Sequence, residues 1–236
     1  FDAQAEQESA DNPLTPLTNE QRRDALPLLT MAFGWGFLIT GLMVGGALGA
    51  GVNFWPDLIY VSFLGNTANF VIGALVGYIG YKTACNSGLL YKFVYGQIGA
   101  YFPVLFLALV LICWQGIVVG AFGFAWAQDF DSTTFYAVAV FAGILFTWTT
   151  YYGVRGLELV STPSVVILVL VGVYAAYTQI SQAGGLQEFL ALSETTAASN
   201  PISKMDAINI VIGSWIVGAI VMPEYTRFAK KAWVAI

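Results

Sequence analysis

The sequence predicts an all-α protein that crosses a membrane several times. Of its 236 residues, 58% are hydrophobic and only 10% are charged, a balance that is unusual for a soluble domain. Apolar runs close to the roughly 20 residues of a transmembrane helix recur along the chain, and lysine and arginine gather in every second connection between them. Because lipid offers no hydrogen bonds to the backbone, each apolar run is expected to be a helix.

Composition also excludes several classes of function. Histidine is absent, and the two cysteines, Cys85 and Cys113, lack a CxxC spacing, so the usual metal and haem motifs have no ligands. The net charge of -5 arises mainly in the N-terminal tail. The chain begins with Phe1 and shows no signal peptide, so we interpret it as a fragment. We expect neither an enzyme nor a nucleic-acid partner.

Windows of about twenty apolar residues predict six transmembrane helices. They cover approximately residues 26–50, 58–81, 101–127, 134–153, 160–180 and 206–222. Residues 1–25 are predicted to be a cytoplasmic tail, and 223–236 a cytoplasmic loop with the start of a further, truncated helix. The mixed segment 81–100 predicts an amphipathic helix at the cytoplasmic membrane surface. Segment 183–205 is expected to be an outer loop containing one short helix.

The basic residues predict the orientation, because cytoplasmic loops collect lysine and arginine. With a cytoplasmic N-terminus, eight of the nine basic residues lie inside and Lys204 alone lies outside. The same topology places these acidic residues outside: Asp57, Asp129, Asp131, Glu188 and Glu194. A missing or additional span would destroy this segregation. We therefore predict a multi-pass protein of the cell membrane with a cytoplasmic N-terminus.

The first predicted span is rich in glycine and reads MAFGWGFLITGLMVGGALGAGVN from residue 31. Gly41, Gly45 and Gly49 repeat every four residues, which predicts a face for close helix packing. The GWG triplet at 34–36 lowers helix propensity by roughly 1 kcal/mol per glycine and predicts a break, with close packing as the alternative. Breaks at membrane depth occur where the backbone is buried in protein or lines a cavity, and transporters use the released carbonyls to bind cations.

Few polar side chains fall within the predicted spans. Asn66, Asn69 and Gln115 are the amides, and no carboxylate or lysine lies near mid-membrane, which disfavours a proton relay. Asn66 and Asn69 share a helix face and predict hydrogen bonds between helices, with ligand contact as the alternative. This composition suits a neutral ligand and a cation bound by carbonyl or hydroxyl oxygens.

Two tryptophans lie near mid-membrane, although tryptophan usually favours the interfaces. Trp114 in the third span precedes Gln115, and Trp215 in the sixth span follows Ser214. A planar ring could stack between the two indoles. Packing against lipid or other helices is the alternative for each tryptophan.

A set of short motifs then occurs in a characteristic order. The motifs are VGGALGAGV (44–52), LGN (64–66), GYIGYKT (77–83), YGQIGAYFP (95–103), CWQG (113–116), AGGL (183–186), VIGSW (211–215) and PEYTRF (223–228). Together they make the chain resemble the cytosine permeases of the nucleobase:cation symporter family, which also includes purine, allantoin and hydantoin carriers. The resemblance runs from about Leu17 to the last residue.

This resemblance implies the inverted-repeat fold of sodium-coupled amino-acid transporters. Five helices are repeated there in opposite orientation, and the first and sixth spans are broken around the substrate. This chain would hold the first repeat and the opening of the second. It is an all-α, polytopic transmembrane bundle in this interpretation, the first half of a five-plus-five inverted repeat.

The resemblance also implies site residues. The break in the first span falls from Gly34 to Leu38, with cation-binding backbone carbonyls at Gly34 and Phe37. The residues expected to bind substrate are Trp114, Trp215, Ser214, Gln115 and Leu38. Two positions depart from cytosine permeases, which tend to have glutamine where this chain has Leu111 and phenylalanine where it has Trp215. Hydantoin carriers have tryptophan at the latter position.

We therefore expect a secondary active transporter that imports a neutral nucleobase, cytosine or a purine-like heterocycle, together with Na⁺ or H⁺. No other cofactor is expected, and the partners are the heterocycle and the lipid bilayer. A hydantoin or allantoin carrier, or an inactive fragment of such a transporter, is the alternative. A channel would require a continuous polar stripe along one helix, and the sequence contains none. The oligomeric state is left open.

Overall fold

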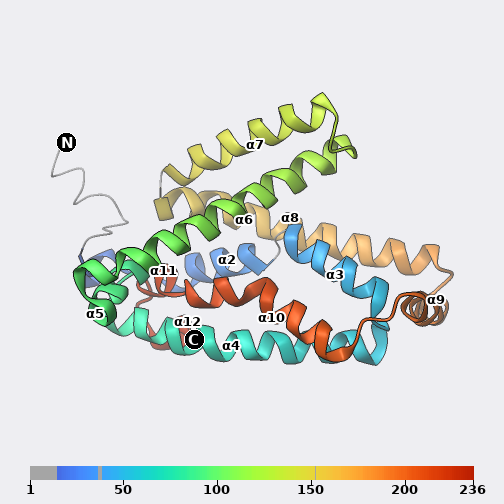
Figure 1. Cartoon of the computed structure of the whole chain (residues 1–236), viewed down its shortest axis with the longest axis horizontal. Helices are drawn as coiled ribbons and strands as arrows, with labels where there is room; N and C mark the ends of the chain where they lie inside the picture. The colour runs from blue at the N-terminus through green and yellow to red at the C-terminus, as the bar shows by residue number, and fades with distance from the viewer. Residues whose placement is uncertain (1–14, 37–38, 152) are drawn as a thin grey trace.

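The computed structural model describes residues 15–36, 39–151 and 153–236, with side chains described outside 35–39 and 152–162. The described chain is built from helices, and its β pairing is one isolated parallel bridge between Arg23 and Ala229. The all-α class predicted from the sequence is confirmed (Figure 1).

The helices have the following bounds. They are α2 (Ala25–Gly36), α3 (Ile39–Gly51), α4 (Ile59–Thr83), α5 (Ser87–Gly99), α6 (Tyr101–Ala127), α7 (Thr133–Tyr151), α8 (Gly153–Gln182), α9 (Leu186–Ser199), α10 (Lys204–Ile220), α11 (Pro223–Thr226) and α12 (Ala232–Ala235), with short turns η1 (Asn19–Gln21) and η2 (Phe54–Leu58). In the part of the chain that the structure describes, five helical segments are long and apolar enough to span a bilayer. They are Phe54–Thr83, Tyr101–Ala127, Thr133–Tyr151, Pro163–Gln182 and Lys204–Thr226. The chain is thus a multi-pass membrane protein.

Two shorter helices occupy the range predicted for the first span. The apolar segments Ala25–Gly34 and Thr40–Gly51 lie in α2 and α3, and each is shorter than the bilayer requires. The GWG triplet, expected to open the break, is still part of α2, which ends at Gly36. Phe37 and Leu38 lie outside the described residues. The region 183–205 contains α9, a helix of 14 residues.

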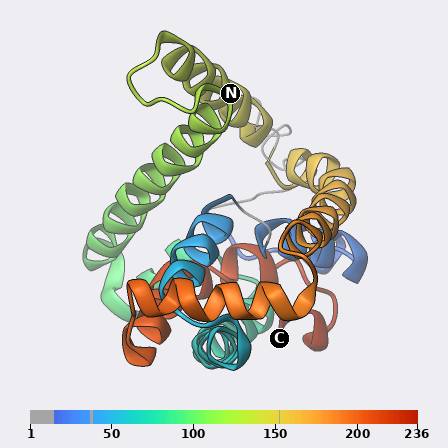
Figure 2. The same cartoon turned by 90° about the vertical axis from the view of Figure 1, so that its right-hand side faces the viewer.

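The helices form two groups (Figure 1). In one group α4 packs along α10, with α3 against α10 and α11 against α4. In the other group α6 packs against α7, and the end view shows both extending away from α4 and α10 (Figure 2). Helix α8 packs against α2 and α7, and α9 lies against α3. The candidate site described below lies between the first group and α2.

Small residues on one face of α4 bring it close to α10, α11 and α12. We call this face the glycine seam; its members are Gly65, Gly73, Gly77 and Gly80, all buried. A Cβ atom at Gly65 would lie 2.6 Å from Val211 Cγ1, and one at Gly80 would lie 2.7 Å from Pro223 Cα. Successive glycines of the seam are eight, four and three residues apart, which places them on one side of the helix, where they permit close van der Waals contact in lipid.

Two of the three glycines predicted to pack closely on the first span, Gly45 and Gly49, have no packing partner among the described residues. A Cβ atom at Gly45 or Gly49 of α3 would meet no described atom within 4 Å. A regular spacing of small residues predicts a helix face that a neighbouring helix can approach closely, but it does not predict that a helix lies there. In the described chain, the glycines that pack closely against other segments lie on α4 instead.

One end of α4 is joined to both termini of the described chain by Arg22. Its guanidinium donates from Nη1 to the carbonyl oxygen of Ala229 at 2.9 Å and from Nη2 to that of Tyr81 at 3.0 Å. It also lies 5.2 Å from the centre of the Tyr81 ring. Backbone hydrogen bonds reinforce the contact: Arg23 N–H donates to Phe228 O at 2.6 Å, and Lys230 N–H donates to Arg23 O at 3.3 Å.

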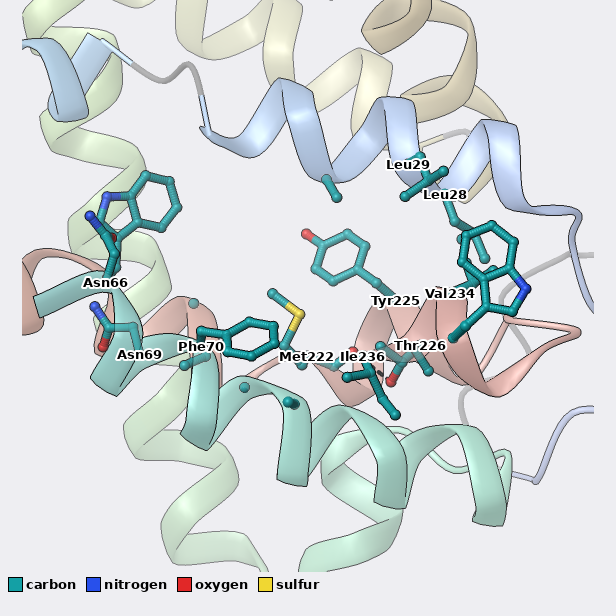
Figure 3. A pocket seen from close by; sticks show the side chains of 18 of the residues that line it. Leu28, Leu29, Asn66, Asn69, Phe70, Met222, Tyr225, Thr226, Val234 and Ile236 are labelled. Atoms are coloured by element: carbon teal, nitrogen blue, oxygen red, sulfur yellow. Dashed lines mark hydrogen bonds between the residues drawn. The ribbon is translucent and has the colours of Figure 1, made fainter. Parts of the chain in front are cut away.

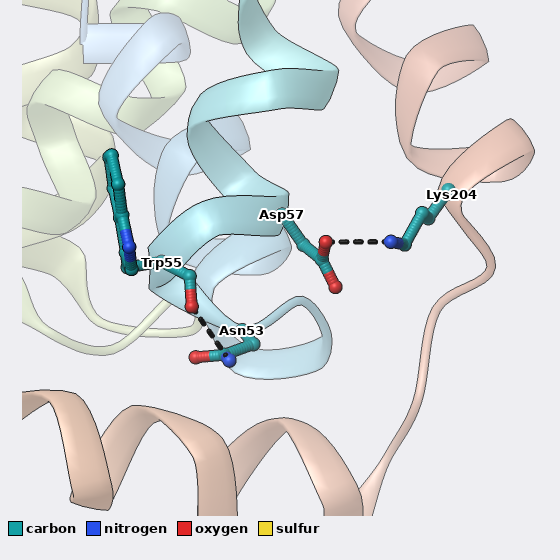
Figure 4. Close-up of polar contacts among 4 residues, drawn as sticks. All are labelled: Asn53, Trp55, Asp57 and Lys204. Carbon is teal, nitrogen blue, oxygen red and sulfur yellow. Dashed lines mark hydrogen bonds and ion pairs between the residues drawn. The ribbon is translucent and has the colours of Figure 1, made fainter.

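The opposite end of α4 carries an ion pair between Asp57 and Lys204, whose charged atoms are 2.7 Å apart (Figure 4). Beside it, Asn53 Nδ2 donates to the carbonyl oxygen of Trp55 at 2.9 Å. Lys204 is the basic residue that the predicted topology places outside, and Arg22 at the other end of α4 is predicted inside. The structure therefore separates these charges along the bundle as that topology requires, while the direction of insertion stays a prediction.

Helix α5 is connected to α11 by Glu224. The N–H of Ser87 donates to Glu224 Oε1 at 2.9 Å, and Asn86 caps α5 by accepting from Leu89 N–H at 2.8 Å, which satisfies one of the donors left at a helix N-terminus. Burial raises the pKa of Tyr91 on α5, and the negative charge of Glu224 raises it further. Glu224 thus contributes to the junction between α5 and α11.

We expect Gly80→Ala to lower the melting temperature of the full-length protein. The new methyl group would lie 2.7 Å from both Pro223 Cα and Thr226 Oγ1, and overpacking of this kind costs about 1–3 kcal/mol. Thermal unfolding of the purified protein in detergent measures the change. Gly45→Ala is the matched control: its methyl group meets no described atom within 4 Å and alanine favours the helix by about 1 kcal/mol, so its melting temperature should be unchanged or higher. An unchanged melting temperature for Gly80→Ala would contradict the close contact.

We expect Arg22→Gln to loosen the contact between the N-terminal segment and residues 228–230. The substitution removes guanidinium hydrogen bonds to two carbonyls, and hydrogen bonds to charged groups contribute about 1.5–3 kcal/mol each. Hydrogen–deuterium exchange of the peptide containing Arg23 should therefore become at least roughly tenfold faster. Lys92→Gln, at an exposed position of α5, should leave this exchange unchanged. Equal exchange in Arg22→Gln and the unmodified protein would argue against the Arg22 contact.

Candidate ligand-binding site

A cavity of about 720 Å³ lies between α2, α3, α4, α10 and the segment after α10 (Figure 3). Its volume is within the range typical of sites for small molecules. Most of its described lining is apolar, and the polar residues in it are Asn66, Asn69, Tyr225 and Thr226, besides the indoles of Trp215 and Trp233. No charged residue belongs to the described lining. The cavity therefore suits a neutral molecule with an apolar body and a small number of polar groups.

The walls of the cavity come from α2, α3 and α4, from the end of α10 and from the segment that follows it. In Figure 3, Leu28 and Leu29 of α2 lie near Val234 at one end of the cavity, and Phe70 of α4 lies toward the other end. On the sixth span, α10 ends at Ile220, and Val221 leaves helical geometry with φ -89° and ψ 9°. Tyr225 and Thr226 of α11 then continue the wall.

Asn69 is the most buried amide of the cavity, with 7% of its surface exposed. Its Nδ2 lies 3.4 Å from the carbonyl oxygen of Val211 and 3.4 Å from that of Ile212, both in α10. Its Oδ1 is buried and has no hydrogen-bond partner among the described residues. The predicted hydrogen bonding between helices is confirmed for Asn69. It is wrong for Asn66, whose Nδ2 donates to Ser62 O of the same helix at 2.9 Å.

The predicted residues of the sixth span lie at or beside the cavity. Trp215 is half-buried and belongs to the lining. Ser214, also half-buried, is outside the described lining, and its hydroxyl donates to Val211 O at 2.8 Å. The carbonyl of Val211 thus accepts hydrogen bonds from both Ser214 and Asn69.

The other predicted residues are not brought to the cavity by the described structure. Trp114 is half-buried and Gln115 exposed on α6, and neither is among the described lining residues. Gly34 is in the last turn of α2. Phe37 and Leu38 lie outside the described residues, so their expected contacts stay predictions.

Sequence reasoning missed several lining residues. Met222, Tyr225 and Thr226 follow the end of α10, within or next to the PEYTRF motif. Arg227 is 4% exposed, and its guanidinium carbon lies 4.7 Å from the centre of the Phe228 ring. A proline after a helical run was the available signal, because it marks a change of backbone direction at which neighbouring side chains can face a cavity.

No model of a known protein family matches the chain. Curated relatives do match: the cytosine permeases of Escherichia coli strain K12, strain CFT073 and O157:H7 are each 27% identical to it over 232 residues. Each alignment covers 97% of this chain and 54% of the permease. The chain therefore spans about half the length of the curated relatives it matches. Over almost its whole length the chain is similar to cytosine permeases, which confirms the resemblance inferred from its ordered motifs.

Proposed function

We propose that the protein containing this chain is a secondary transporter that imports a neutral nucleobase, cytosine or a purine-like heterocycle, together with a cation. The observation that carries the proposal is the cavity between α2, α3, α4 and the end of α10, whose described lining is uncharged and includes Trp215 and two asparagines. The similarity to cytosine permeases over 97% of the chain supports the same class of ligand. No covalent chemistry is required.

The lining matches the two chemical surfaces of a heterocycle. The faces of the ring are apolar and can stack on the Trp215 indole, a contact worth about 0.5–1.5 kcal/mol beyond area burial. The edge of the ring carries hydrogen-bonding groups, which Asn66, Asn69 and Thr226 can meet within the same cavity. Because the described lining has no charged residue, an ionised ligand would lose its hydration without compensation.

Trp114 is proposed as the second stacking ring, with Gln115 and Ser214 near the polar edge of the ligand. In this structure α6 packs mainly against α7 and contributes no described lining residue. The role of Trp114 therefore requires α6 to lie closer to α10 in the substrate-bound protein. Leu38, at the proposed break in the first span, would contact the ligand from the side of α3.

Sodium is proposed as the coupling ion, bound by backbone carbonyls of Gly34 and Phe37. Gly34 lies in the last turn of α2, where carbonyls have no partner within their own helix and the helix dipole favours positive charge. A cation there and a heterocycle in the cavity would both favour the closed arrangement of the first span, and this shared preference would couple their movement. A proton is the alternative ion.

A hydantoin or allantoin carrier is the second candidate. Trp215 favours it, because hydantoin carriers have tryptophan where cytosine permeases have phenylalanine. The same cavity would accept either ring, so the choice depends on the positions of donors and acceptors along the ligand edge.

We expect one of cytosine, uracil, hypoxanthine, allantoin and hydantoin to bind the purified full-length protein saturably, as measured by isothermal titration calorimetry in sodium buffer. Trp215→Ala should weaken this binding by roughly tenfold or more, since it removes both the stacking contact and its buried area. Trp126→Ala is the matched control, because Trp126 is 70% exposed at the end of α6 and should not contribute. Wild-type affinity in Trp215→Ala would remove the stacking role, and no binding of any of the five ligands would reject the proposed ligand class.

We expect replacement of sodium by choline to weaken ligand binding by roughly 5- to 150-fold, the range of typical coupling between two sites. In proteoliposomes, an inward sodium gradient should drive uptake, whereas a proton gradient in sodium-free buffer should not. Sodium-independent binding together with proton-driven uptake would reject the sodium site at Gly34 and Phe37 and favour the alternative ion.

A further inference from the structure

We propose that Glu224 is a positioning residue for ligand binding, which places one wall of the cavity by holding α11 against the first turn of α5. The inference rests on the proposed function and adds a form of control over its site. Helix α5 contributes no residue to the described lining of the cavity, yet it influences the affinity for the ligand through Glu224. The segment 81–100, predicted to lie at the membrane surface, thereby acquires a role in binding.

The first support is the contact between Glu224 and the start of α5. Glu224 Oε1 accepts a hydrogen bond from the N–H of Ser87 at 2.9 Å, and Ser87 is the first residue of α5 and only 3% exposed. The first N–H groups of a helix have no partner within that helix, and a carboxylate beside them is favoured by the helix dipole. Glu224 therefore joins α11 to α5 by a hydrogen bond to a charged group, which is stronger than one between neutral groups.

The second support is that Glu224 directly precedes residues of the cavity wall. Tyr225 and Thr226 belong to the described lining, and in Figure 3 the Tyr225 ring extends from α11 into the cavity. Helix α11 has only four residues, Pro223–Thr226. A helix this short is not stable by itself, so its position is determined by the contacts around it. A shift of Glu224 would consequently move Tyr225 as well.

The third support is the direction of each contact around α11. Successive residues of a helix point about 100° apart. Pro223 and Thr226 lie against the glycine seam, because Cβ atoms at Gly80 and Gly77 would lie 2.7 Å from Pro223 Cα and 3.1 Å from Thr226 Cγ2. Glu224, between them in the sequence, holds a different side of α11 to α5. The seam brings α11 close to α4, and the contact with α5 fixes its rotation, which sets the direction of Tyr225.

These contacts predict a reciprocal effect between α5 and the cavity. If the contact with α5 and the ligand favour the same position of α11, each must strengthen the other by the same factor. Loss of the contact then weakens ligand binding, and ligand binding slows the opening of the first turn of α5. A contact that served stability alone would show neither effect.

The experiment measures calorimetric affinity in sodium buffer for the tightest-binding ligand among cytosine, uracil, hypoxanthine, allantoin and hydantoin. In the full-length protein, Glu224→Ala should weaken binding by roughly 5- to 150-fold, the range of typical coupling between sites. Glu224→Gln keeps an acceptor on a side chain of the same length, so its affinity should be closer to that of the unmodified protein. Glu194→Ala is the matched control, because Glu194 is exposed on α9 and outside the described lining, and it should leave the affinity unchanged.

Ser87→Pro tests the same contact from the side of α5, and it also serves if Glu224→Ala does not fold. Proline removes the N–H that Glu224 accepts and is well tolerated at the first position of a helix. Asn86 has φ -76° and ψ 171°, which suits a residue before proline. The Ser87 hydroxyl has no hydrogen-bond partner among the described residues, so no further bond is lost. Ser87→Pro should weaken ligand binding by a factor similar to that of Glu224→Ala.

Two further measurements distinguish positioning from a general loss of structure. The variant carrying both Glu224→Ala and Ser87→Pro should bind no more weakly than the weaker single variant, because both substitutions remove one contact. Saturating ligand should slow hydrogen–deuterium exchange of the peptide covering residues 86–92 by roughly fivefold or more in the unmodified protein. It should not slow this exchange in Glu224→Ala.

The outcomes separate the inference from the function on which it rests. Unchanged affinity in both single variants, additive losses in the double variant, or equal losses in Glu224→Gln and Glu224→Ala would overturn the role of Glu224 and leave heterocycle binding intact. Exchange in residues 86–92 that does not respond to ligand would overturn it as well. Failure of the unmodified protein to bind any of the five heterocycles would overturn the proposed function and the inference together.

Discussion

The close approach of α4 to α10 and α11 is the contact on which the rest of the described structure depends. In lipid, helices gain little from burying apolar surface against one another, so association relies on close van der Waals contact and hydrogen bonds. The glycine seam provides the first, since added Cβ atoms at Gly65 and Gly80 would lie within 2.7 Å of the opposing segments. Asn69, on the same face, provides the second. Trp215 is positioned at the cavity as a consequence of this packing.

Charged groups are placed at the ends of this helix pair, while its interior is neutral. Arg22 joins the end of α4 to the segment after α11, and the Asp57–Lys204 ion pair lies at the opposite end. Charges near the interface keep part of their hydration, whereas a charge at membrane depth is expensive. The cavity between the two ends is consequently uncharged in its described lining, and this property supports a neutral aromatic ligand over an ionised one.

The proposed coupling of ion and ligand follows from the same arrangement. The carbonyls at the end of α2 would favour a cation, and α3, which begins at Ile39, supplies Gly41 and Leu42 to the cavity. A single interrupted span would thus contribute to both sites. Asn69 adds a connection from the other side, because it contacts α10 and the cavity at once.

Length and hydropathy are local properties, so the sequence by itself determined the all-α, membrane-spanning class, and α6 covers the same residues, 101–127, as the predicted third helix. The ordered motifs were likewise sufficient to establish the similarity to cytosine permeases. The tertiary structure decided which small residues pack, because Gly45 and Gly65 are equally suited by type, and of these two only Gly65 has a described segment packed against it. It also decided that Asn69 bonds across helices while Asn66 bonds within its own, and that Trp215 lines the cavity whereas Trp114 is not among its described lining residues. These outcomes depend on which helix lies opposite a residue, and spacing along one chain segment does not contain that information.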